Sequence, residues 1–269
     1  MWISKATISG SDIRFAARLG AVFMVLGAAV PAVAQTSHHD AAQATGLPAA
    51  QDLVARHVKL VNADAIIAHG SFRTVSEFSM PSLGMTGRIH VVGAAPGRMS
   101  MTMTLPGLGE IASGFDGTTG WSMNPMEGPR LMSDQELSQI RDEADFDANI
   151  RSSRLIESME TVERADFGGK ACWKVRLLWK SGRETFDCYD VETGFLIATM
   201  MQTQTAMGSI ASTILFDEYT DYHGVMMPRV SRQQAFGQEM TVTIESIEFG
   251  GVDATAFALP DAIRALVGK

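Results

Sequence analysis

The chain has 269 residues, a net charge of −8 and a hydrophobic fraction of 46%. The acidic balance disfavours nucleic acid and anionic membrane surfaces as partners. The length is sufficient for one large β domain or two small domains.

Residues 1–34 have the pattern of a secretory signal peptide. Three basic residues precede the apolar run at 19–33, and the run ends in an Ala-x-Ala cleavage pattern. A membrane anchor is the alternative, but the run is short and is interrupted by a glycine and a proline. We expect cleavage near Ala34/Gln35 and a periplasmic mature protein that does not span the membrane. Because the leader carries three basic residues and one acidic residue, the mature net charge would be about −10.

The first folded element predicted is a helix. Residues 35–47 are small and polar, and we expect a disordered tail there. Pro48 then opens a segment in which Leu53, Val54, His57 and Val61 recur at helical spacing. We expect one domain over 48–269.

From Ser71 onward the hydrophobic period changes to two, which predicts strands near 71–80, 85–92 and 98–105. Alternate side chains of a strand share a face, so Met99, Met101 and Met103 lie together. Methionine is flexible and polarizable, and it adapts to irregular partners. The face therefore serves either as core filling or as the wall of an apolar cavity, to which Met80 would also contribute.

A tight turn is predicted at Asp116-Gly117, between strands 109–115 and 120–123. Phe115 precedes this turn, and Trp121 and Met123 follow it. We expect Asp116 and Gly117 to serve the turn first, and Trp121 to be either core or cavity wall.

One convincing helix interrupts the strands at mid-chain. Ser133 begins a capping box with Glu136, and Leu137 and Ile140 lie on one apolar stripe. The opposite side is charged, so this helix is predicted to lie on another surface as a lid.

Strands resume between 157 and 249, and a last short helix is predicted at 261–267. The two cysteines, Cys172 and Cys188, flank a turn at 180–183 and become diagonal neighbours on one face. An export compartment favours a disulfide between them, and two buried thiols are the alternative.

Sequence patterns of catalysis are missing. The chain contains no HExxH, no Gly-x-Ser-x-Gly and no P-loop, and its six histidines are scattered. We expect no enzymatic activity, no metal and no cofactor.

Several motifs resemble, in order, those of the LolA-like, outer-membrane lipoprotein-sorting family. The stretch FDGTTGWSMNP at 115–125 is the first, and the others fall at 143–147, 168–175, 189–194 and 217–228. The resemblance implies a mainly β (α+β) fold: an incomplete, curved antiparallel β-barrel, of about eleven strands here, with the N-terminal helix and the lid helix in or over its open side. One departure is Ala95, which stands before Pro96 where LolA proper carries an arginine.

Together these observations predict a periplasmic carrier that binds lipoprotein acyl chains or lipids in a methionine-rich cavity. A regulatory or scaffold module that binds another envelope protein is the alternative. The residues expected to line the cavity are Met80, Met99, Met101, Met103, Phe115, Trp121, Met123, Leu137 and Ile140.

Overall fold

The computed structural model describes residues 46–205 and 208–268. The predicted signal peptide with its cleavage point, and the predicted tail up to residue 45, lie outside the described residues.

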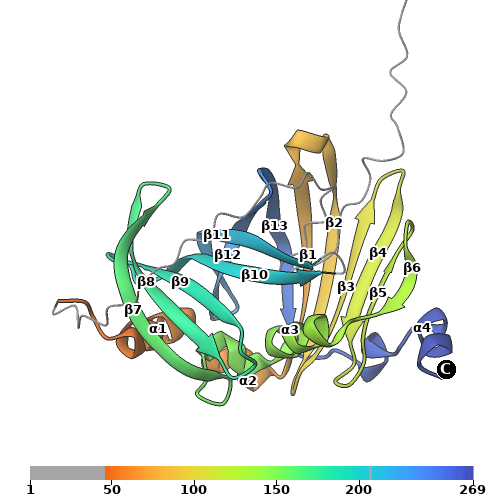
Figure 1. The fold of residues 1–269 in the computed structure, drawn as a ribbon, viewed down its shortest axis with the longest axis horizontal. Helices are drawn as coiled ribbons and strands as arrows, with labels where there is room; N and C mark the ends of the chain where they lie inside the picture. Colours follow the sequence, from red (N-terminus) through yellow and green to blue (C-terminus); the bar gives the residue numbers. More distant parts are fainter. Residues whose placement is uncertain (1–45, 206–207, 269) are drawn as a thin grey trace, which may run out of the picture.

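All strands belong to one curved antiparallel sheet (Figure 1). The order across the sheet is β6-β5-β4-β3-β2-β1-β13-β12-β11-β10-β9-β8-β7. The strands are β1 (Ser71–Met80), β2 (Met85–Ala94), β3 (Arg98–Leu105), β4 (Gly109–Phe115), β5 (Gly120–Asn124), β6 (Gly128–Leu131), β7 (Ile156–Phe167), β8 (Lys170–Trp179), β9 (Glu184–Asp190), β10 (Leu196–Thr205), β11 (Gly208–Tyr222), β12 (Val225–Ala235) and β13 (Gln238–Phe249). Because β6 and β7 each pair with one neighbour, the sheet is open and not a closed barrel.

Three helices lie on the concave side of the sheet and one lies outside it (Figure 1). The helices are α1 (Ala50–Val61), α2 (Ala63–His69), α3 (Asp134–Ala144) and α4 (Asp261–Val267), with short 3-10 turns η1 (Pro81–Leu83), η2 (Phe146–Ile150) and η3 (Ala254–Phe257). Leu53 and Val54 of α1 pack against Val175, Leu177 and Tyr189 of β8 and β9. The N-terminal helix therefore fills the β7–β10 half of the concave side.

Six hairpin turns lie at one end of the sheet, because neighbouring antiparallel strands alternate in direction. They connect β1–β2, β3–β4, β5–β6, β8–β9, β10–β11 and β12–β13. We call this end the mouth rim. A contact between two of these turns supports their common location. Ser82, in the connection between β1 and β2, is hydrogen-bonded to Gln238 at the start of β13.

The predicted fold class is confirmed, with differences in detail. The mid-chain and C-terminal helices begin and end close to their predicted bounds. The sheet has thirteen strands, whereas about eleven were expected. The four-residue β6 was missed because it is too short and too polar to show a period, and α2 was missed because Asn62, with φ 55°, separates it from α1 by a single residue.

Candidate functional site

The methionines of β3 face the concave side, as the alternation predicted. Met99, Met101 and Met103 pair directly with Gly93, Val91 and Ile89 of β2, and cross-strand partners share a face. Met101 and Met103 are 2% and 1% exposed.

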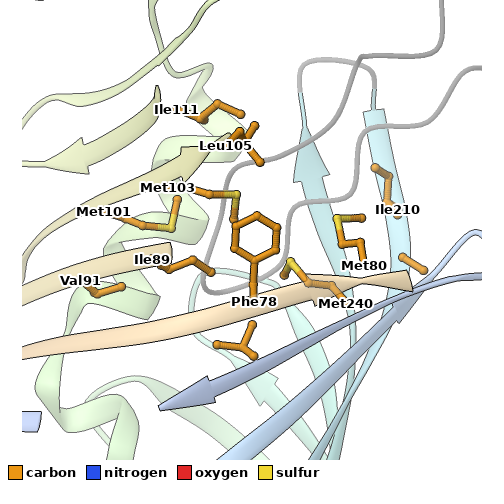
Figure 2. Packing of buried hydrophobic residues seen from close by; sticks show 12 residues of the cluster. Phe78, Met80, Ile89, Val91, Met101, Met103, Leu105, Ile111, Ile210 and Met240 are labelled. Atoms are coloured by element: carbon orange, nitrogen blue, oxygen red, sulfur yellow. The ribbon is translucent and has the colours of Figure 1, made fainter. Parts of the chain in front are cut away.

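These side chains belong to an apolar cluster that crosses the curved sheet, which we call the methionine cluster (Figure 2). The ring of Phe78 lies at its centre in the close-up view. A Cβ at Gly87 would come within 2.6 Å of this ring, so glycine is required beneath it. The buried members are Phe78, Met80, Ile89, Val91, Met101, Met103, Leu105, Ile111, Ile210, Ala235, Met240 and Val242.

Helix α3 extends the apolar surface at one end of β3. Ile140 of α3 packs with Phe115, and Met99 and Leu137 contact the same group. The predicted capping box is present: the Ser133 hydroxyl accepts from the Glu136 amide, and the Glu136 carboxylate accepts from the Ser133 amide. Arg130 donates two hydrogen bonds of 2.9 Å to that carboxylate, whose side chain is 2% exposed.

Polar contacts hold the other side of α3 to the mouth rim. The guanidinium of Arg183, in the β8–β9 turn, lies 3.6 Å from Asp142 and 3.3 Å from Glu143. Gln139 accepts a 2.8 Å hydrogen bond from the backbone amide of Gln204 at the end of β10. Helix α3 therefore bridges the two halves of the concave side.

An open cavity of about 1120 Å³ lies between α3 and the hairpins β8–β9, β10–β11 and β12–β13. Met201 of β10 and Ala235 of β12 line it, and Ala235 is also a member of the methionine cluster. Most of the cavity's other strand residues, such as Gln202 of β10 and Gln234 of β12, are one residue out of phase with Met201 and Ala235 and therefore face away from the cluster. The volume of the cavity slightly exceeds the roughly 300–1,000 Å³ of ordinary small-molecule sites.

None of the nine residues predicted to line a cavity lines the mouth cavity. Seven of them lie on the concave face, packed in the methionine cluster or against α3. Trp121 and Met123 do not, and that expectation is corrected. Trp121 pairs with Gly114, one residue out of phase with Phe115, so it faces the convex side and packs against Ile263 of α4. The mouth cavity, formed mostly by β9–β13 turns and α3, was not predicted, because its walls come from segments distant in sequence.

The other predicted positions are structural. The Asp116 carboxylate accepts hydrogen bonds of 2.8 and 2.7 Å from the amides of Thr118 and Thr119, and Gly117 has φ 105°. Ala95 packs with Ile66 and Phe146, so a small apolar side chain occupies the place of the family arginine.

The predicted disulfide is not formed in this structure. Cys172 and Cys188 are buried free thiols on the convex face, and Cys172 pairs with Asp190 as the predicted hairpin requires. A hydrogen bond between the two thiols lowers the pKa of Cys172 and raises that of Cys188.

Sequence reasoning missed a buried polar network beneath α1. Arg151 pairs with Asp187 at 2.9 Å, and the Thr199 hydroxyl donates to the same carboxylate at 2.8 Å. The ring of His57 lies 5.6 Å from that of Tyr189, which is hydrogen-bonded to Asp187. Burial, followed by the charge of Arg151, lowers the pKa of His57 to about 4. No local sequence signal joins residues so far apart in the chain.

Within residues 46–205 and 208–268, no group of three or more His, Cys, Asp or Glu side chains is arranged to hold a metal ion. None of the helices in these ranges is long and apolar enough to cross a membrane.

Comparison with solved structures identifies a LolA-like fold. A LolA superfamily protein from Nitrosomonas europaea aligns over 79% of this chain and 99% of its own length, with 11% identity and a TM-score of 0.54. A DUF1329 family protein from Desulfovibrio piger covers 77% of this chain and 95% of its own, at 10% identity and a TM-score of 0.51. An outer membrane lipoprotein-sorting protein domain from Vibrio parahaemolyticus covers 80% and 100%, at 9% identity and a TM-score of 0.47. No family model and no curated protein matches the sequence.

Proposed function

We propose that this protein is an exported, periplasmic carrier that binds acylated amphiphiles on the concave face of its sheet. The observation that carries the proposal is the methionine-rich apolar surface on the concave face, which the curved sheet wraps around. Burial of an alkyl chain against such a surface contributes about 0.8 kcal/mol per methylene. Thioether side chains can adjust to the many shapes of an alkyl chain.

The fold supports the proposal because the sheet is open and a cavity lies at one end of it. The mouth cavity is bounded by α3, which is attached to the rim by ion pairs and hydrogen bonds. Helix α3 would thus serve as a lid over the bound chain.

The first test is binding of a fluorescent fatty-acid probe to the purified protein after its own lipids are removed by solvent extraction. The extract is analysed by mass spectrometry. We expect co-purified lipid and saturable probe binding. Absence of both would refute the carrier function. A stoichiometric protein partner recovered by cross-linking in envelope extracts, without lipid, would instead favour the scaffold alternative.

A matched pair of variants locates the site. Met201 is half-buried and lines the cavity, whereas Met126 in the β5–β6 turn is 59% exposed. Met201→Glu places a carboxylate against apolar surface, and we expect it to weaken probe binding by about tenfold or more, equivalent to ~1.4 kcal/mol. Met126→Glu should leave binding unchanged. Equal effects of the two substitutions would place the site elsewhere.

A further inference from the structure

Four consecutive turns of the mouth rim carry apolar side chains. They connect β5–β6, β3–β4, β1–β2 and β12–β13, and these hairpins follow one another in the order of the sheet. Met126, Leu83 and Phe236, in three of the turns, are 59%, 40% and 52% exposed. Leu108 lies in the β3–β4 turn and packs in part against the methionine cluster. We call these four turns the apolar rim.

Contacts between the turns show that they are neighbours in space. Ser82 in the β1–β2 turn is hydrogen-bonded to Gln238 beside the β12–β13 turn. A Cβ at Gly109, directly after the β3–β4 turn, would lie 3.2 Å from Pro125 in the β5–β6 turn. In Figure 1 the β1–β2 and β3–β4 hairpins point in the same direction, and α4 lies toward the other end of the sheet. The apolar rim therefore forms one edge of the molecule.

The apolar rim is almost free of charge, although the chain as a whole is acidic. The β1–β2, β3–β4 and β12–β13 turns contain no charged side chain between their strands. Glu127 in the β5–β6 turn is the exception, and it accepts a 3.0 Å hydrogen bond from Asn124 and lies 3.9 Å from Arg130. Anionic lipids are attracted by clusters of lysine and arginine, which these four turns lack.

The methionine cluster begins directly inward of three of these turns. Met80 precedes the β1–β2 turn, Leu105 precedes the β3–β4 turn, and Ala235 precedes the β12–β13 turn. All three side chains are buried members of the cluster. A hydrocarbon chain that moved from the rim to the concave face would therefore stay in contact with apolar side chains and out of water.

The spacing of the exposed side chains fits a lipid surface better than a folded protein. Residues that contribute most to a protein interface cluster near its desolvated centre. Tips of adjacent hairpins are about 10 Å apart, because neighbouring strands lie about 4.8 Å apart. The backbone of a turn cannot enter hydrocarbon without losing its hydrogen bonds to water, so only the apolar side chains at the tips would enter a bilayer, at the depth of the head groups.

We propose that the apolar rim docks on a lipid surface without net charge, and that the protein exchanges its ligand there. Leu83, Met126 and Phe236 would insert at the boundary between head groups and acyl chains, where burial of their exposed apolar area stabilises the bound state. This inference rests on the proposed carrier function and adds the surface at which the carrier is loaded or emptied.

Co-sedimentation with phosphatidylcholine vesicles measures docking. We expect the purified protein to bind these vesicles, and neither added phosphatidylglycerol nor lower salt to strengthen binding. The double variant Leu83→Ser/Met126→Ser should bind the vesicles about tenfold more weakly. Val267→Ser removes an apolar side chain that is 51% exposed on α4, away from the rim, and as the matched control it should bind like the parent.

Binding of the fluorescent fatty-acid probe in the absence of vesicles separates docking from ligand binding. Leu83 and Met126 do not line the mouth cavity and are not members of the methionine cluster. We therefore expect the double variant to bind the probe in solution as tightly as the parent.

The rate at which the probe leaves loaded vesicles gives a second measurement. A probe that crosses through water leaves at a rate limited by its own desorption, whatever the protein concentration. A probe collected at the lipid surface leaves faster as more protein is added. We expect this acceleration for the parent and for Val267→Ser, and its loss in the double variant.

Three results would overturn the docking inference: no binding to phosphatidylcholine vesicles, an equal loss of binding in Val267→Ser, or binding that requires anionic lipid. Self-association without vesicles that the double variant abolishes would also overturn it, because the rim would then be an interface between copies of this chain. In each case the probe in solution decides the carrier function separately, and that function fails only if the probe does not bind the parent.

Discussion

Stability below neutral pH should depend on His57 of α1, which is the one buried histidine among the described residues. His57 is 9% exposed, and its Nδ1 accepts a 3.2 Å hydrogen bond from the amide of Leu196. Its pKa falls from 6.5 to about 4, first because of burial and then because of the nearby charge of Arg151, although Asp187 acts in the opposite direction. The folded protein therefore holds this ring neutral through the mildly acidic range.

The direction of the pH effect on the free energy of unfolding follows from how many protons the folded and the unfolded chain bind. Between pH 6.5 and 4 the unfolded chain binds a proton at this ring and the folded protein does not, so acidification favours unfolding. A pKa difference of about 2.5 corresponds to about 3 kcal/mol when fully expressed. Between pH 7 and pH 5 the expected loss of unfolding free energy from this group is about 2 kcal/mol.

Urea unfolding at a series of pH values, for the parent and for His57→Gln, measures this contribution. Other groups titrate equally in the two proteins, so the difference between their slopes isolates the histidine. We expect the parent to lose about 2 kcal/mol more than the variant between pH 7 and pH 5. Parallel slopes, or an NMR titration of the ring with a midpoint near 6.5, would refute the burial argument.

Three further substitutions test the packing of the concave side, and the quantity measured for each is the change in the free energy of unfolding. Met103→Ala should cost about 2–5 kcal/mol because this side chain is 1% exposed within the methionine cluster; a cost below 1 kcal/mol would mean that the cluster is loosely packed. Arg151→Met should cost about 3–5 kcal/mol by leaving the Asp187 carboxylate buried without its cation, and adding Asp187→Asn should recover part of the loss, whereas additive losses would contradict the pairing. Ser133→Ala should cost about 0.5–2 kcal/mol by removing the N-cap of α3, and an unchanged urea midpoint would show that α3 does not contribute to global stability.

Periodicity in the sequence could predict much of the β1–β4 region. Strand side chains alternate with a period of two whatever surrounds them, so the shared face of Met99, Met101 and Met103 followed from their spacing alone. The capping box at Ser133 and Glu136 is equally local, and it identified the start of α3.

The face on which Trp121 lies could not be predicted from its neighbours in the sequence. The sequence placed it on a strand beside a turn, but only the pairing of Phe115 with Gly120 puts Trp121 on the opposite face from Phe115. The C-terminal helix that covers it there comes from residues about 140 positions later.

By itself, the sequence determined the antiparallel strand pattern, the mid-chain helix and the shared face of the β3 methionines, because each depends on interactions over a few residues. Only the tertiary structure decided that Arg151 meets Asp187 beneath His57, and that glutamines from α3, β10 and the β12–β13 turn surround one cavity. These groups lie far apart along the chain, and their meeting depends on how thirteen strands curve and pair. Curvature and pairing are properties of the whole sheet, which no short stretch of residues encodes.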